Sequence, residues 1–329
     1  MQKVLPRKLA AIALAGLLTV LVAACGDDDD DGGGEAAGGP LSFTVGVVDP
    51  DLGSIALLEA IDVLKQDGND IQDVEVAEPE LAIEGLAQGR FQFSGETTST
   101  ALTANQQGAP VKLIGDLAGN AWSMWVSEEI SACEDLDGRR FGIFSQGSVA
   151  TAMVKNWVAQ TCPGTEPEYL VLGDSSTRFA ALQAGEIDGT ALELSDSLTI
   201  DESEGLTQLV DFAEEFPELR PSTLYANAEF IESDPEATQS FIDAVNEVDQ
   251  QISEDPDYLA GLIEKHLPDT EDIEGVARAY SERDLFDVTA LTAESLEDTI
   301  AFFEEAGSIE PGLSPEDAAD LSFVEALNQ

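Results

Sequence analysis

Short apolar runs alternate with helical patterns along the chain after residue 40. Phe43–Val48 and Val111–Leu117 are typical of buried strands, whereas the segments between such runs carry apolar residues at helical spacing. Gly89, Gly108 and Gly185 follow predicted helices, where a left-handed residue commonly ends a helix. Strands and helices that alternate at this spacing predict βαβ units, a largely parallel sheet and the α/β fold class.

The same pattern predicts where the elements lie. We expect strands at residues 43–48, 74–76, 91–94, 111–117, 140–144, 169–172, 187–192 and 224–227, and helices at residues 54–64, 80–88, 97–107, 148–161, 175–184, 235–253, 256–266, 272–283, 293–306 and 315–327. Pro235, Pro256 and Pro315 stand at predicted helix starts, where proline is favoured. The chain is therefore expected to end in a helical C-terminal part.

A weak internal repeat links the two strand–helix series. Leu81–Phe93 and Phe179–Asp188 each contain a helix, a terminal glycine, a charged residue and the start of a strand. The terminal glycines, Gly89 and Gly185, lie 96 residues apart. Amphipathic helices that end in glycine also recur by chance. Two copies at matching places in the two series predict two similar α/β lobes.

The first 24 residues are typical of an export signal. Lys3, Arg7 and Lys8 precede an uncharged apolar run from Leu9 to Val22, which is short for a membrane span. The run ends in Val-Ala-Ala-Cys25, which resembles a bacterial lipobox. The resemblance implies that Cys25 is acylated and becomes the first mature residue, so that lipid anchors the protein to the outer face of the cytoplasmic membrane. A single-span anchor and a signal cut elsewhere are the alternatives.

Residues 25–40 are rich in Asp, Gly, Glu and Ala and carry almost no apolar surface. Such a segment buries too little to offset the entropy of ordering, so we expect an acidic flexible tether rather than a metal site.

Acidic residues dominate the whole chain. The 66 acids and 14 bases give a formal charge of −52, which argues against nucleic-acid binding because such binding needs a basic footprint. A field this strong is screened at high salt, which suggests a saline habitat; an ordinary acidic secreted protein is the alternative.

Several segments match one known family along residues 43–266. They are Phe43–Val47, Leu86–Ser94, Gly108–Ile114, Cys133–Ile143, Ala181–Gly189 and Phe230–Ala237. Together they resemble the substrate-binding proteins of ABC importers, in the branch that includes sulfonate, taurine, nitrate and thiamine-pyrimidine binders. Gln92 departs from the family pattern, which usually has a structural Asp there.

The resemblance implies a type II periplasmic-binding-protein fold of two lobes with the ligand in the cleft between them. Lobe one would hold residues 41–125 and 213–329, and lobe two residues 126–212. Two crossover strands would join the lobes near residues 122–126 and 210–216, and ligand would be captured by hinge closure.

Ligands of open parallel sheets bind outside the carboxyl ends of the strands, which gives a separate way to choose site residues. The candidates at strand ends are Asp49, Ser94, Glu96, Thr97, Trp122, Ser145, Gly147, Ser148 and Glu193. Residues 145–148 open a helix whose free N–H groups can hold a polar group, although simple N-capping explains the same residues.

The charged candidates bear on the ligand. Glu96 and Glu193 would face the cleft from opposite lobes and favour a cationic or N–H-rich ligand over a bare anion, unless they are merely solvated acids. Trp122 can stack on a flat or cationic ligand, or pack in the core of a crossover strand. Arg178 lies within a helix pattern rather than at a strand end.

Two cysteines remain besides Cys25. In an oxidising compartment Cys133 and Cys162 are expected to form a disulfide, with two unpaired buried thiols as the alternative. We expect no metal and no cofactor, because close clusters of His and Cys are lacking. His266 is the single histidine, and no Gly-x-Ser-x-Gly motif or Cys-rich motif of pyrimidine-synthesising relatives occurs, so we do not expect an enzyme.

These observations predict an exported, lipid-anchored solute-binding protein of an ABC importer. Its partners would be a small polar ligand, the permease and ATPase subunits and the membrane, and it would be a monomer. A receptor of the same fold that reports ligand to a membrane sensor is the main alternative, and an exported hydrolase or a structural lipoprotein is the other.

Overall fold

The computed structural model describes residues 39–48, 50–201 and 205–328. The predicted signal segment, Cys25 and the tether up to residue 38 lie outside these described residues, as does Asp49. Among the described residues, no helix is long and apolar enough to cross a membrane.

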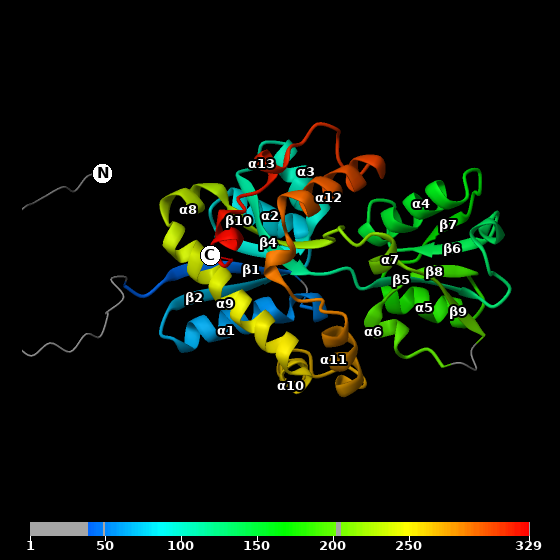
Figure 1. Ribbon diagram of the computed structural model, residues 1–329, viewed down its shortest axis with the longest axis horizontal. Helices are drawn as coiled ribbons and strands as arrows, with labels where there is room; N and C mark the ends of the chain where they lie inside the picture. Colours follow the sequence, from blue (N-terminus) through cyan, green and yellow to red (C-terminus); the bar gives the residue numbers. More distant parts are fainter. Residues whose placement is uncertain (1–38, 49, 202–204, 329) are drawn as a thin grey trace, which may run out of the picture. The chain divides into compact units, whose positions relative to one another are not determined.

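The described strands form two five-stranded sheets (Figure 1). The first sheet has the order β2 (Asp70–Val76), β1 (Ser42–Val48), β3 (Phe93–Thr97), β10 (Ser222–Asn227) and β4 (Val111–Ala118). The second has the order β7 (Glu168–Val171), β6 (Arg140–Ile143), β8 (Gly189–Glu193), β5 (Trp122–Ser127) and β9 (Leu206–Asp211).

Each sheet is mixed rather than largely parallel. β1 runs parallel to β2 and β3, whereas β10 is antiparallel to β3 and β4. β6 likewise runs parallel to β7 and β8, whereas β5 is antiparallel to β8 and β9. The reason is the exchange of strands, because β4 leads into β5 of the other sheet and β9 leads back into β10. The predicted α/β class is confirmed, and each sheet receives its antiparallel strand through a crossover.

Helices cover both faces of each sheet. They are α1 (Ile55–Gln66), α2 (Pro79–Ala87), α3 (Thr98–Gln106), α4 (Val149–Thr161), α5 (Ser175–Gln183), α6 (Leu194–Ser197), α7 (Phe212–Glu215), α8 (Ala228–Ser233), α9 (Pro235–Glu254), α10 (Pro256–His266), α11 (Ile273–Glu282), α12 (Ala293–Glu305), α13 (Pro315–Ala318) and α14 (Ser322–Ala326), with 3-10 turns η1 (Leu52–Ser54), η2 (Cys133–Leu136) and η4 (Val288–Ala290).

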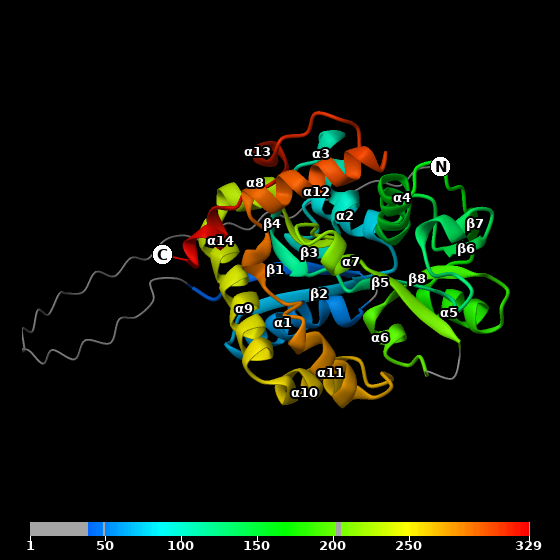
Figure 2. The same cartoon turned by 45° about the vertical axis from the view of Figure 1, so that its right-hand side comes forward.

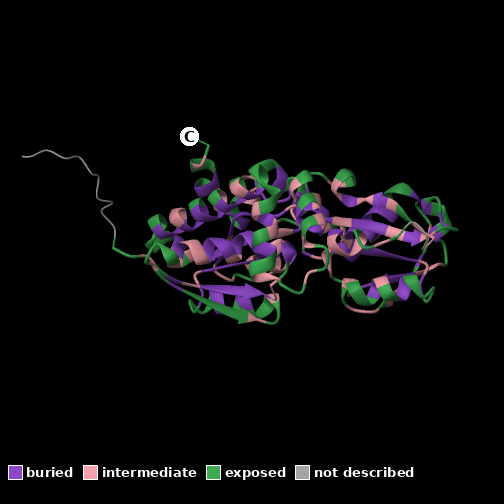
Figure 3. Cartoon of the chain, turned by 90° about the horizontal axis from the view of Figure 1, so that it is seen from below, coloured by how far each residue is buried: buried purple, intermediate pink, exposed green. Residues whose placement is uncertain are grey.

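One apolar core joins β1, α1 and the helices α9 to α11, and a second joins α2, α3, α12 and the α4 side of the second sheet (Figure 2). Figure 3 shows the central strands as buried and the outer helix faces as exposed, and the edge strand β2 is mostly exposed as well. A separate small cluster of Ala181, Leu182 and Ile187 lies under α5.

The two halves repeat with an offset of 96 residues. The Ser94 hydroxyl donates to the carbonyl of Gly46 at 2.7 Å, and the Thr190 hydroxyl donates to the carbonyl of Gly142 at 2.9 Å. Helices α2 and α5 begin 96 residues apart and each is followed by a glycine of positive φ, Gly89 or Gly185. The repeat predicted from sequence is therefore present in the structure.

The predicted helix over 315–327 is wrong, because it is two short helices. Between them Ala319 forms a β-bridge to Leu113, and the amide of Asp320 donates to the Leu113 carbonyl at 2.9 Å. These bonds to the edge strand β4 replace the helical ones. Ser54, where the predicted helix 54–64 begins, lies in η1: its hydroxyl closes a capping box with Asp51 and makes no side-chain cap for α1.

A disulfide joins Cys133 and Cys162, whose Cα atoms are 5.9 Å apart. Cys133 begins η2 and Cys162 is the C-terminal cap of α4. The bond therefore ties the entry loop of the second sheet to the helix that covers it.

Candidate ligand-binding cleft

A cavity of about 930 Å³ lies where the carboxyl ends of the parallel strands of both sheets meet. Its wall includes residues that follow β1, β2 and β3 of the first sheet and β6, β7 and β8 of the second. Both crossovers and the strand starts that follow them contribute to it, through Gly119, Ala121, Trp122, Pro221 and Ser222. This is the place where open α/β sheets bind ligands.

The structure brings most of the sequence-predicted candidates to this cavity. The wall contains Glu96, Thr97, Trp122, Ser145, Gly147, Ser148 and Glu193. Ser94 is not part of the wall: it is fully buried, and its hydroxyl is engaged by Gly46, so we do not retain it as a ligand contact. Asp49 lies outside the described residues.

The Ser145–Ser148 loop caps α4 and also lines the cavity. The Ser148 side chain accepts from the amide of Thr151 at 3.4 Å and so caps α4, while Ser148 also lines the cavity. Its hydroxyl lies 2.9 Å from that of Thr151. The start of α4, with the positive end of its dipole, therefore borders the cavity.

Glu96 projects from the end of β3. Its carboxylate accepts a hydrogen bond from the amide of Thr97, the next residue. Burial raises the pKa of Glu96 above its ordinary value, and the nearby charge of Asp51 raises the pKa further. The hydrogen bond from Thr97 lowers the pKa but does not cancel the rise.

Glu193 projects from the end of β8, on the second-sheet side of the cavity. Burial is the main cause that raises its pKa to about 8, the charges of Asp51 and Asp196 add to the rise, and Arg178 opposes it. Glu193 forms no ion pair with any residue that the structure describes. A cation that entered the cavity would compensate this carboxylate.

The described wall carries seven carboxylates and one basic side chain. The acids are Asp51, Glu78, Glu80, Glu96, Asp174, Glu193 and Asp196. The base, Arg178, is fully buried on α5 and donates to the hydroxyl of Thr190 at 3.1 Å and to the carbonyls of Gly173 and Ala191. These bonds tie the end of β7 to β8, so Arg178 serves first to shape the wall. The cavity as a whole favours a positive ligand.

Sequence reasoning missed two aromatic residues of the wall. Phe144 ends the predicted strand 140–144 and has 51% of its surface exposed, which is unusual for a large apolar side chain beside a cleft. Tyr280 comes from α11, in the helical tail, and the apolar stripe of that helix predicts only a core position for it. Trp122, Phe144 and Tyr280 give the cavity three aromatic side chains.

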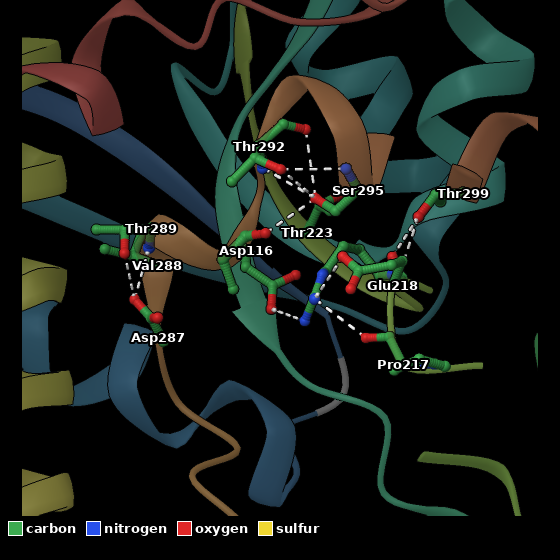
Figure 4. Close-up of polar contacts among 12 residues, drawn as sticks. Asp116, Pro217, Glu218, Thr223, Asp287, Val288, Thr289, Thr292, Ser295 and Thr299 are labelled. Carbon is green, nitrogen blue, oxygen red and sulfur yellow. Dashed lines mark hydrogen bonds and ion pairs between the residues drawn. The ribbon is translucent and has the colours of Figure 1, made fainter. Parts of the chain in front are cut away.

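A buried polar network lies behind the cleft, next to both crossovers. Asp116 on β4 faces Arg220, which precedes β10, with 3.9 Å between Oδ2 and Nη1. The other carboxylate oxygen of Asp116 and the Nε of Arg220 are buried without a partner among the described residues. Figure 4 shows Asp116 within this network, near Glu218 and Thr299. Burial raises the pKa of Asp116 to about 7, and Arg220 opposes the rise.

His266 lies away from the cavity. Its Nε2 is 2.9 Å from Oε2 of Glu59, and Lys265 bridges the same oxygen and Asp62. Among the described residues, Glu59, Asp62 and His266 are the one group whose ligand atoms are close enough to hold a metal ion, but Lys265 already compensates their charge.

The sequence matches a family model described as NMT1/THI5 like over residues 64–258, more than half of the chain. The chain belongs to the NMT1/THI5-like family. The resemblance seen in the sequence is thereby confirmed for the central part of this NMT1/THI5-like protein. A comparison with curated proteins gives no significant match.

Solved structures share the fold of this NMT1/THI5-like chain. The ligand-binding component of an ABC-type import system from Staphylococcus aureus, with zinc bound, has a TM-score of 0.70 at 15% identity and covers 87% of this chain and 98% of its own. The periplasmic aliphatic sulphonate-binding protein SsuA from Escherichia coli has a TM-score of 0.69 at 17% identity, and the match covers 86% of this chain and 92% of that protein. The alkanesulfonate-binding protein SsuA from Xanthomonas axonopodis pv. citri, bound to MOPS, has a TM-score of 0.66 at 17% identity, and the match covers 87% of this chain and 100% of that protein. The periplasmic-binding-protein fold is therefore confirmed.

Proposed function

We propose that this protein is the extracytoplasmic solute-binding lipoprotein of an ABC importer and that it captures a small organic cation or N–H-rich heterocycle. The single observation that carries the ligand class is the described wall of the cavity, which sets seven carboxylates against one arginine that is already hydrogen-bonded to β8. The family and the fold support the importer role.

The two sheets with their helices act as lobes in this proposal, and the crossovers at residues 119–121 and 212–221 act as hinges. Because the wall draws residues from both sheets, a ligand that contacts both at once stabilises the closed form. Glu96 from one side and Glu193 from the other then pair with the ligand's positive groups. Trp122 and Phe144 cover its flat or apolar part.

The proposal places the protein outside the cell, anchored through acylated Cys25, with the acidic segment after it as a tether. It acts as a monomer that delivers ligand to permease and ATPase subunits. It has no catalytic step and needs no cofactor.

Mass spectrometry of small molecules released from denatured, freshly purified protein tests the ligand class. The released compound is expected to be a cation or an N–H-rich heterocycle that raises the melting temperature of stripped protein when added back. Its uptake into membrane vesicles that contain the cognate permease and ATPase is expected to require this protein. Release of a sulfonate or another simple anion would overturn the ligand class, and uptake without the protein would overturn the importer role.

A further inference from the structure

Helix α11 places the Tyr280 hydroxyl at the cavity wall, where it makes no well-formed hydrogen bond with the residues that the structure describes. Tyr280 is 2% exposed and lines the cavity, and its hydroxyl is buried without a hydrogen-bond partner among the described residues. Its polar neighbours are Glu193 and Ser195 of the second sheet side. A buried hydroxyl without a partner costs free energy, so its retention at a cavity wall points to a partner that arrives with the ligand.

Tyr280 comes from a part of the chain that the family model does not cover, because the match ends at residue 258. Val276, Ala277 and Tyr280 of α11 are buried in one apolar core together with residues of α10. The ring also stacks on Phe286, with centroids 6.2 Å apart. The hydroxyl is therefore held at one point of the wall and does not move freely.

The end of α11 also touches both crossovers. The carbonyl of Leu285 accepts from the amide of Gly119 in the first crossover at 2.7 Å. Arg283 pairs with Asp211 at the start of the second crossover, with 2.9 Å between Nη2 and Oδ2. The helix that holds Tyr280 is thus connected to both segments that must bend if the two sheets move.

We propose that Tyr280 is a specificity-determining residue of the cleft, whose hydroxyl and the carboxyl of Glu193 bind the same N–H-bearing group of the ligand. The inference rests on the proposed function and adds to it the recognition of one ligand group by α11. A neighbouring carboxylate and phenol hydroxyl accept two hydrogen bonds from an amidinium, a guanidinium or a protonated aminoheterocycle, whereas a quaternary ammonium has no N–H to offer them.

The test uses full-length Tyr280→Phe, which removes the hydroxyl and keeps the ring. Tyr225→Phe is the matched control, because the Tyr225 hydroxyl is also buried and has no hydrogen-bond partner in the described part of the chain, but Tyr225 is not part of the described cavity wall. Isothermal titration calorimetry would measure the affinity for benzamidine and for phenyltrimethylammonium. The assay temperature is one at which all variants are folded.

We expect Tyr280→Phe to weaken benzamidine binding about tenfold or more, which is the effect of losing one hydrogen bond to a charged group. Phenyltrimethylammonium binding and the melting temperature of the ligand-free variant should not fall, and Tyr225→Phe should bind as wild type does. Unchanged benzamidine affinity in Tyr280→Phe, or an equal loss for both probes, would overturn the role of the hydroxyl while leaving the proposed function in place. If neither probe binds the wild-type protein, the cationic ligand class fails, and this inference fails with it.

Discussion

Gln92 and Asp188 hold equivalent positions in the two halves of the protein, 96 residues apart. The side-chain oxygen of Gln92 accepts from the amide of Thr44 at 2.8 Å, and that of Asp188 accepts from the amide of Arg140 at 2.9 Å. Arg140 also gives Asp188 an ion pair at 3.0 Å, whereas Thr44 offers no cation. A neutral amide therefore suits position 92, which explains the departure from the Asp that the family pattern usually has.

Because the partners of Gln92 and Asp188 differ, replacing each residue by alanine should lower the free energy of unfolding by a different amount. Gln92→Ala removes two hydrogen bonds between neutral groups, one accepted from the Thr44 amide and one donated to the Gly89 carbonyl, and should lower the free energy of unfolding by about 1 kcal/mol. Asp188→Ala also removes an ion pair with Arg140, whose side chain is 42% exposed, and should lower the free energy of unfolding more than Gln92→Ala does. Urea unfolding at pH 7 measures both values, and equal losses would contradict the assignment.

The Asp188 effect should also depend on pH. The hydrogen bonds and charge of Arg140 hold the pKa of Asp188 below its ordinary value of 3.8. A depressed folded-state pKa gives stability that is present above the unfolded pKa and lost as the pH falls through the folded one. The difference in the free energy of unfolding between wild type and Asp188→Asn should therefore shrink below about pH 4. The corresponding difference between wild type and Gln92→Ala should not change with pH.

Asp116 behaves in the opposite way. Its folded-state pKa of about 7 lies above the ordinary 3.8, so between these values the folded protein binds a proton that the unfolded chain has lost. Asp116 therefore lowers stability as the pH rises from about 4 to 7. The melting temperature of Asp116→Asn should rise relative to that of wild type as the pH increases through this window, and the difference should stay constant above pH 7. A difference that is constant from pH 4 to 8 would contradict the raised pKa.

Much of the site could be predicted because it depends on local order. Glu96 and Glu193 end strands, and the Ser145–Ser148 loop begins a helix, so their places follow from strand–helix alternation alone. Tyr280 could not be predicted in the same way. It lies in an amphipathic tail helix, and only the packing of α11 beside the crossovers brings it to the cavity.

The errors in the fold have the same origin. The segment 315–327 has the composition of one helix, yet bonds to the distant strand β4 divide it. The mixed sheets arise from the exchange of β5 and β10, which joins residues between 63 and 133 positions apart. Pairings of this kind leave no local mark in the sequence.

The disulfide should contribute measurably to the stability of the second sheet region. Cys133 and Cys162 are 29 residues apart and buried, and a cross-link of this span restricts the unfolded chain by about 3 kcal/mol. The double variant Cys133→Ser/Cys162→Ser should lose that amount in urea unfolding. Wild type in reducing agent should match the double variant, and no difference between oxidised and reduced protein would contradict the bond.

The raised pKa of Glu193 makes cation binding depend on pH. Below about pH 8 the free carboxyl holds a proton that a bound cation must displace. The affinity for benzamidine should therefore rise up to tenfold per pH unit towards pH 8 and level off above it. Glu193→Gln should bind weakly with a flat pH profile; a wild-type profile that is equally flat would contradict the assignment.

The central claim is that carboxylates from both sheets hold a positively charged ligand in the cleft. Calorimetric titration of stripped protein with the compound released from it, for wild type, Glu96→Gln, Glu193→Gln and the exposed control Glu264→Gln, tests it most directly. The account predicts that both cleft variants lose at least tenfold in affinity while Glu264→Gln binds as wild type does. Full affinity in both cleft variants, or tight binding of a simple anion, would contradict it.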